Sequence, residues 1–289
     1  MRQNLIGWCF ILPSLLAFLL FMFLPILLGA WYSLTNYTGL SKEYDFIGMA
    51  NYFKLFQDRY FKVSIKNNCV YALWYSALTM VLSLGLATLL NRLVRFRKFF
   101  RIAFFLPYIT SMVSVAVIWK MIYNPKGGPL NTLLMQLGVA NPPQWLASTT
   151  WALYAVILVS VWKSCGYYML IFLAGLQNVP DSLYEAASLD GAGKGQQYLK
   201  ITLPLISPTV FLNMILITIS SFQVFDLISV MTEGGPGMST NVLAYRIYYE
   251  GFKQMHMGYA SAIAYFLFAV VLLITMIQFA VQKYWVNYD

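Results

Sequence analysis

Six long apolar segments constrain the fold of this chain more than any other feature of its sequence. A helix that crosses a bilayer needs about 20 mainly apolar residues, because it rises about 1.5 Å per residue through a hydrocarbon core of about 30 Å. Segments of this kind cover residues 5–31, 68–90, 102–123, 150–176, 201–230 and 258–282. The first is longer than the apolar run of a signal peptide and lacks a small-residue cleavage site after it, so we expect it in the mature protein. The sequence predicts an all-α membrane protein with six transmembrane helices.

The composition supports a membrane protein and excludes a soluble enzyme or a disordered chain. Hydrophobic residues make up 60% of the 289 residues and charged residues only 10%, against about 25% charged residues in soluble domains. Aromatic residues, at 17%, suit the two membrane interfaces. The net charge is +9. In so apolar a chain, we expect the anionic partner to be membrane lipid and not nucleic acid.

The residues that bind metals or perform catalysis are sparse. Cys9, Cys69 and Cys165 each lie in an apolar stretch without a second cysteine nearby, and His256 is the only histidine. Without an acidic cluster beside them, we predict no metal site and no catalytic residue in this chain.

Basic residues set the expected orientation. The link between the second and third apolar segments contains Arg92, Arg95, Arg97, Lys98 and Arg101. By the positive-inside rule this link is cytoplasmic, and with six spans both termini are then cytoplasmic. Elsewhere in the chain the excess of Lys and Arg on the cytoplasmic side is weaker, so the predicted orientation depends mostly on this one link.

An external segment follows the first span. Phe53, Phe56 and Tyr60 recur there at helical spacing, which predicts an amphipathic stretch lying along the membrane surface. We therefore divide the chain into residues 1–66, with the first transmembrane helix and this segment, and residues 67–289, a five-helix core.

The residue types of the loop at residues 180–204 predict its local structure. Pro180 stops the preceding helix, and Ser182 with Glu185 has the S-x-x-E spacing of a capping box. Gly191 and Gly193 can end the new helix and reverse the chain at positive φ. The pattern predicts a helix-turn-helix that protrudes from the cytoplasmic face.

The glycines of this loop do not form a nucleotide site. In a Walker A motif, a glycine would stand at Ser188 and a hydroxyl residue at Gly195, after Lys194. Neither position matches, so we expect no ATP-hydrolysing site in this chain.

The same loop resembles the EAA loop of ATP-binding-cassette (ABC) importer permeases. The defining positions are Glu185, Ala186, Ala187, Gly191, Ile201, Leu203 and Pro204. The segments FIGMANYFKLFQD, RIAFFLPYITSMVSVAVIWKMIYNPKGGPLN, IFLAGLQNVP, MTEGGPGMST and MGYASAIA are similar to the carbohydrate-import branch, and specifically to MalF-like permeases. Unlike the largest members, we expect this protein to have no extra amino-terminal helices and no large inserted external domain.

The resemblance implies a type I ABC importer permease fold in a bacterial or archaeal cytoplasmic membrane. It implies a second, MalG-like permease, two ATPase subunits that carry ATP and Mg, and an extracytoplasmic sugar-binding protein, with no cofactor in this chain. The EAA helix would couple to an ATPase through Leu183, Glu185, Ala186, Ala187, Asp190 and Gly191.

Polar residues inside the apolar segments are candidates for a substrate pathway. Polar groups are costly in hydrocarbon, so they mark either helix contacts or a pathway. The candidates share two neighbouring helices: Trp162, Lys163, Ser164 and Tyr167 on one, and Asn213, Ser220 and Gln223 on the other. Aromatic rings beside hydroxyl and amide groups suit a sugar, although interhelical hydrogen bonding would explain the same pattern.

The sequence is compatible with two other functions. The same machinery could import a polyol or a glycerol-phosphate-like solute. From a different class, an ion-coupled secondary transporter usually places ionisable residues at the membrane midplane, where this chain has only Lys163. Lys163 needs water or a partner, which could be an acidic sugar or a carbonyl. Asp226 is the only acidic residue within a span, but it lies toward the outer end of its segment.

Overall fold

A computed structural model describes residues 2–41, 43–92 and 96–287. Within these residues, helices are the regular secondary structure, apart from one antiparallel bridge between Thr35 and Phe46. The first half of the chain contains α1 (Arg2–Phe18), η1 (Leu19–Phe23), α2 (Leu24–Ser33), α3 (Ala50–Gln57), α4 (Arg59–Arg92), α5 (Arg97–Ile109), α6 (Met112–Ile122), α7 (Pro129–Gln136) and η2 (Trp145–Ala147). The second half contains α8 (Ala152–Gln177), α9 (Asp181–Leu189), α10 (Lys194–Gln197), η3 (Tyr198–Thr202), α11 (Leu203–Leu205), α12 (Ser207–Phe222), α13 (Asp226–Met231), α14 (Leu243–Tyr248), η4 (Tyr249–Lys253) and α15 (Met257–Gln282).

Five helical stretches of the described chain are long and apolar enough to cross a membrane. They are Phe10–Ser33, Arg59–Asn91, Ala152–Gln177, Ser207–Met231 and Met257–Gln282. A sixth crossing exists if the bent pair α5 and α6 counts as one span. The all-α membrane class expected from the sequence is therefore confirmed, with five or six apolar helices.

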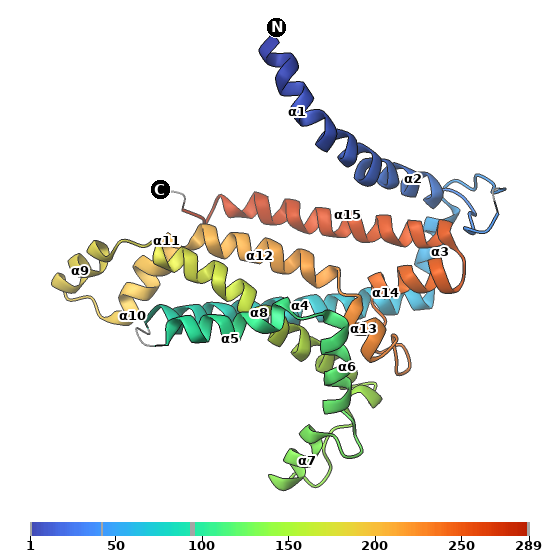
Figure 1. Ribbon diagram of the computed structural model, residues 1–289. Coiled ribbons are helices and arrows are strands. Elements are labelled where there is room, and N and C mark those ends of the chain that lie inside the picture. Colours follow the sequence, from blue (N-terminus) through green and yellow to red (C-terminus); the bar gives the residue numbers. More distant parts are fainter. Residues whose placement is uncertain (1, 42, 93–95, 288–289) are drawn as a thin grey trace. The chain divides into compact units, whose positions relative to one another are not determined.

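The third apolar segment, predicted as one helix over residues 102–123, forms two helices. α5 ends at Ile109, α6 begins at Met112, and their axes differ by 96° (Figure 1). Pro107 lies in the last turn of α5 and lacks a backbone N–H, which weakens the helix there. The Thr110 hydroxyl donates a 2.6 Å hydrogen bond to the Pro107 carbonyl. Hydropathy detects the apolar run but not this break.

The contacts divide the chain into two compact units, and the first consists of Met1–Lys62 with Arg246–Ala269. In it, the Asn51 side chain donates 2.8 Å hydrogen bonds to the carbonyls of Ser33 and Thr35, which fix α3 to the end of α2. The amphipathic segment is helical over α3, where Phe53 and Phe56 are exposed. Tyr60, predicted on the same helix, lies in α4, because the backbone is extended at Asp58 between the two helices.

A charged cluster in this first unit joins residues that are distant in sequence. The Asp58 carboxylate accepts hydrogen bonds from Tyr259 (2.7 Å) and Arg246 (3.3 Å), and Glu250 accepts from Arg246 and pairs with His256. Burial alone would raise the pKa of Asp58. Hydrogen bonds from Tyr259 and the Tyr60 backbone, with the Arg246 charge, outweigh burial, so the pKa of this carboxyl is lowered from its ordinary value.

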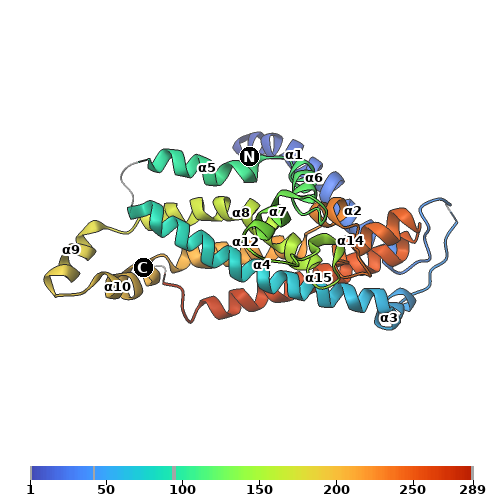
Figure 2. The same cartoon turned by 90° about the horizontal axis from the view of Figure 1, so that it is seen from below.

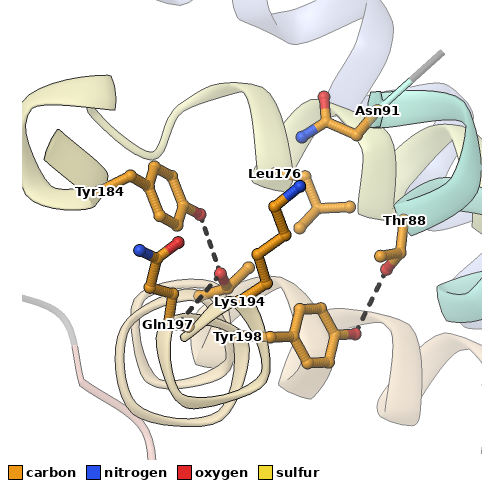
Figure 3. Close-up of a pocket in the computed structure, with 8 residues that line it drawn as sticks. Thr88, Asn91, Leu176, Tyr184, Lys194, Gln197 and Tyr198 are labelled. Carbon is orange, nitrogen blue, oxygen red and sulfur yellow. Dashed lines mark hydrogen bonds between the residues drawn. The ribbon is translucent and has the colours of Figure 1, made fainter. Parts of the chain in front are cut away.

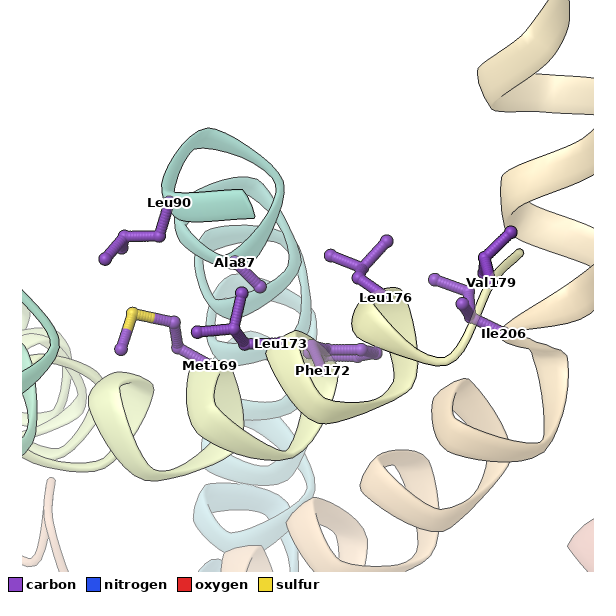
Figure 4. Close-up of a cluster of buried hydrophobic side chains, with 8 residues drawn as sticks. All are labelled: Ala87, Leu90, Met169, Phe172, Leu173, Leu176, Val179 and Ile206. Atoms are coloured by element: carbon purple, nitrogen blue, oxygen red, sulfur yellow. The ribbon is translucent and has the colours of Figure 1, made fainter. Parts of the chain in front are cut away.

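The second unit consists of Val63–Tyr245 with Val270–Asp289, and α8 is its central helix. α8 packs against α5, α12 and α13, and both views show it beside α5 and α12 (Figures 1 and 2). Close to one end of α8, buried apolar side chains form a cluster that joins it to α4 and to the start of α12 (Figure 4). Its members are Ala87, Leu90, Met169, Phe172, Leu173, Leu176, Val179 and Ile206.

The close approach of α5 to α8 depends on Gly166. A Cβ atom at this position would lie 1.8 Å from the Phe104 carbonyl oxygen, so Gly166→Ala must push the two helices apart. We expect a loss of about 1–3 kcal/mol of stability, as for other overpacked sites. Thermal unfolding of the purified protein measures it.

Gly85→Ala is the matched control, because a Cβ atom at this α4 position meets nothing within 4 Å. It should unfold at the wild-type temperature or slightly above, since alanine favours helix over glycine. Equal unfolding temperatures for Gly166→Ala and Gly85→Ala would contradict the close contact.

Candidate functional site: a polar cavity and a protruding loop

A cavity of about 180 Å³ lies in the second unit, against α8. Apolar side chains complete its wall, and its polar lining residues are Tyr71, Tyr75, Tyr108, Ser160, Lys163, Ser164, Tyr168, Ser220, Gln223 and Asp226. The lining comes from α4, α5, α6, α8, α12, α13 and the turn before α13. Tyrosine rings and short hydroxyl side chains therefore face one space.

Hydrogen bonds between hydroxyl groups fix the cavity wall. The Tyr75 hydroxyl donates to the Ser164 Oγ at 3.0 Å, which joins α4 to α8, and Ser164 donates to the Ser160 carbonyl at 2.7 Å. The Tyr168 and Ser220 hydroxyls lie 3.1 Å apart, which joins α8 to α12. Because each hydroxyl both donates and accepts, this wall can offer either role to a polar solute.

Lys163 is buried beside the cavity, and its ammonium group forms hydrogen bonds with backbone carbonyls. It is 5% exposed, and its Nζ donates to the carbonyl oxygens of Pro107 (2.9 Å), Tyr108 (3.0 Å) and Thr110 (2.7 Å). Of the partners considered from the sequence, a carbonyl is the one found, and the carbonyls belong to the backbone. Among the residues described, no group of three or more His, Cys, Asp or Glu side chains could hold a metal ion.

The cavity brings together some of the candidate pathway residues and not others. Lys163, Ser164, Ser220 and Gln223 line it. Three candidates lie outside its lining: Trp162, half-exposed and 5.5 Å from the Trp119 ring; Tyr167, stacked on Tyr108 at 4.5 Å; and Asn213, fully buried. The Asn213 amide donates weakly to the Tyr168 carbonyl at 3.5 Å, and its buried Oδ1 has no hydrogen-bond partner.

The tyrosines that dominate the wall were not predicted from the sequence. Tyr71 and Tyr75 stand one helical turn apart on α4, with their rings stacked at 5.5 Å, and Tyr168 follows the candidate Tyr167. The i, i+4 spacing of Tyr71 and Tyr75 was a usable signal. The pathway predicted from the sequence drew on α8 and α12 only, and not on α4.

The predicted helix-turn-helix is present at residues 181–205, but its expected cap is wrong. Pro180 occupies the N-cap position of α9, and no side chain caps the helix. Ser182 and Glu185 therefore do not form the capping box, because Ser182 already lies inside the first turn. Gly191 has φ +79°, as predicted, whereas Gly193 does not reach positive φ and instead precedes α10.

The loop projects beyond the end of α8 in both views (Figures 1 and 2). Leu183 and Leu189 are 40% and 90% exposed. Glu185, Ala186, Asp190 and Gly191 are exposed and Ala187 is partly exposed. Five of the six candidate coupling residues are therefore accessible on α9 and the turn after it, and Ala187 partly so.

Two contacts between hydroxyl groups connect the parts of this loop to each other and to α4. The Tyr184 hydroxyl of α9 lies 2.8 Å from Thr202 Oγ1 of η3, and the Tyr198 hydroxyl lies 3.2 Å from Thr88 Oγ1 of α4. These residues line a second cavity, of about 420 Å³, into which Lys194 extends toward Asn91 and Leu176 (Figure 3). These contacts join α9 to η3, and η3 to α4.

Comparison with known proteins decides the family. Residues 79–285 match the family described as "Binding-protein-dependent transport system inner membrane component". The chain belongs to this family. The resemblance to ABC importer permeases is confirmed, and this inner membrane permease has many curated relatives.

Three relatives show the breadth of the match. The permease is 40% identical to the probable ABC transporter permease protein YurN of Bacillus subtilis, over 95% of this chain and 94% of the relative. It is 33% identical to the sn-glycerol-3-phosphate transport system permease protein UgpA of Pectobacterium atrosepticum, over 100% and 97%. It is also 33% identical to the diacetylchitobiose uptake system permease protein NgcF of Streptomyces coelicolor, over 92% and 79%.

A solved structure shares the fold of this permease. A chain of a bacterial alginate ABC transporter, crystallised with an alginate pentasaccharide-bound periplasmic protein, superposes with a TM-score of 0.87 at 24% identity. The match covers 98% of this chain and 95% of that chain. The permease therefore has the type I permease fold expected from its sequence.

Proposed function

We propose that this permease is the membrane subunit of an ATP-driven, binding-protein-dependent sugar importer, and that its tyrosine-lined cavity is part of the pathway. The cavity beside α8 carries the proposal. Sugars offer C–H faces that stack on aromatic rings and hydroxyls that need donors and acceptors. Tyr71, Tyr75 and Tyr168, with Ser164 and Ser220, supply both kinds of contact.

The size of the cavity supports a pathway shared with a second chain. Ligand sites usually measure about 300–1,000 Å³, whereas this cavity has about 180 Å³. We infer that a second, MalG-like permease supplies the opposite wall. An extracytoplasmic binding protein would deliver the sugar to this pair.

The energy source would lie on other subunits. We assign ATP and Mg to two partner ATPases, leaving no catalytic residue and no cofactor on the permease. α9 would dock on an ATPase, since Leu183 and Leu189 offer exposed apolar contacts and Glu185 offers a charge for a basic group. This assignment puts the α9 loop and both chain termini on the cytoplasmic side.

Two relatives bear on the solute. NgcF belongs to a diacetylchitobiose uptake system and UgpA to an sn-glycerol-3-phosphate transport system, so import of a polyol or glycerol-phosphate-like solute is the second candidate. The ion-coupled alternative has little support, because the ammonium of Lys163 is bound to backbone carbonyls.

Calorimetry followed by transport tests the proposal. The cognate binding protein is titrated with neutral oligosaccharides, an acidic oligosaccharide and sn-glycerol-3-phosphate. The solute that binds is then offered to vesicles that contain the assembled transporter and internal ATP. We expect uptake of an oligosaccharide that requires both ATP and binding protein. Uptake of sn-glycerol-3-phosphate alone would support the second candidate, and ATP-independent uptake driven by an ion gradient would contradict both.

A further inference from the structure

We propose that Lys163 is a positioning residue whose ammonium group fixes the break between α5 and α6, and that it is not a ligand for the transported solute. The inference rests on the proposed function only in treating the cavity as the solute pathway. The geometry of the break itself is independent of which solute passes.

The carbonyls at the end of α5 need donors that the helix cannot supply. The last carbonyls of a helix have no intrahelical partners, and the helix dipole makes this end negative. The 96° turn to α6 also prevents α6 from continuing the hydrogen-bond ladder. The Lys163 ammonium meets this need with bonds of 2.7–3.0 Å to the carbonyls of Pro107, Tyr108 and Thr110.

These bonds occupy the whole hydrogen-bonding capacity of the side chain. An ammonium has three N–H donors and no acceptor, and each donor has a carbonyl partner here. A carboxylate of a passing solute would have to displace one of these carbonyls. The Pro107 carbonyl would keep the Thr110 hydroxyl as a donor, but the Tyr108 or Thr110 carbonyl would lose this charged donor in a low-dielectric site. The cation beside the cavity therefore holds the backbone and does not make the pathway selective for acidic solutes.

The break is close to the cavity wall. Tyr108 and Met112, one on each side of it, both line the cavity. The Tyr108 ring is stacked on Tyr167 at 4.5 Å with 10° between the ring planes, and Lys163 Nζ lies 6.0 Å from its centroid. One turn along α8, Gly166 has no side chain, so the Phe104 backbone can approach α8 closely. Lys163 and Gly166 thus hold the end of α5 from the same face of α8.

Hydrogen–deuterium exchange on the assembled transporter, without any solute, tests this role. In Lys163→Met the ammonium is lost while the aliphatic stem is kept. We expect amides in residues 104–115 to exchange about tenfold faster, because local opening of this segment becomes easier. Amides of α9 and α10 should be unchanged. Lys163→Arg, which keeps the charge and several donors, should restore most of the protection.

Lys120→Met is the matched control. Lys120 lies in α6 and makes one long bond, 3.4 Å, to the Val230 carbonyl, so its loss should leave residues 104–115 protected. If Lys163→Met does not assemble, Lys163→Gln takes its place. Its side chain has two N–H donors and no charge, so the exchange rates of residues 104–115 should rise, but by less than about tenfold.

Three results would overturn the proposal: wild-type exchange at residues 104–115 in these Lys163 variants, faster exchange throughout the chain, or equal exchange for Lys163→Arg and Lys163→Met. Failure of the wild-type transporter to import a sugar would contradict the proposed function and leave this result unaffected.

Discussion

Glu185→Lys in α9 should abolish transport while leaving the permease inserted in the membrane. Glu185 is exposed on the projecting helix, and we propose that it meets a basic group of an ATPase subunit. Reversing its charge would place two like charges together, at a cost of several kcal/mol. We expect ATP-dependent uptake to fall by at least about 30-fold and the ATPase to be lost on affinity purification of the permease.

Two companion variants separate docking from folding. Glu185→Gln removes the charge without reversing it and should retain more ATPase than Glu185→Lys. Glu43→Lys makes the same charge reversal in the exposed segment before α3, which we expect on the other side of the membrane, so the ATPase should still co-purify. Normal uptake and normal ATPase recovery with Glu185→Lys would refute the coupling role of α9.

Tyr168→Ala should raise the KM of sugar uptake more than any other single change in the cavity wall. The substitution removes the ring that would stack on the sugar and the hydroxyl that lies 3.1 Å from Ser220. Loss of one hydrogen bond costs about 0.5–1.5 kcal/mol, so Tyr168→Phe should raise the KM of uptake roughly two- to tenfold. Tyr168→Ala should raise it further, because the stacking area is lost as well.

Asn213→Ala is the control for this series. Asn213 is also polar and lies on α12, but it is fully buried and absent from the cavity lining. It should keep the wild-type KM even if the yield of complex changes. Reduced yield with an unchanged KM for all the Tyr168 variants would instead assign these residues to helix packing.

The sequence was sufficient for the features that depend on local composition. The length of the apolar segments predicted the membrane class. Gly191 predicted the turn after α9, where its φ of +79° suits glycine. The EAA positions gave the family. Each of these signals is contained within a short stretch of chain.

Features that depend on distant partners were beyond the sequence analysis. The break after Pro107 is completed by Lys163, more than fifty residues later in the sequence. The Asp58 cluster draws Arg246 and Tyr259 from the far end of the chain. Tyr71 and Tyr75 reach the cavity wall only because α4 packs beside α8. Hydropathy and residue spacing carry no information about such pairings.

Protection of a single cysteine by sugar tests the account most directly. Ser164→Cys, in a chain without its three natural cysteines, places a thiol on the cavity wall, and Ser188→Cys places one on exposed α9. During turnover with ATP and loaded binding protein, the imported sugar should slow thiol labelling at residue 164 and leave labelling at residue 188 unchanged. Equal labelling of Ser164→Cys with and without the sugar, in a complex that still transports it, would contradict a pathway through this cavity.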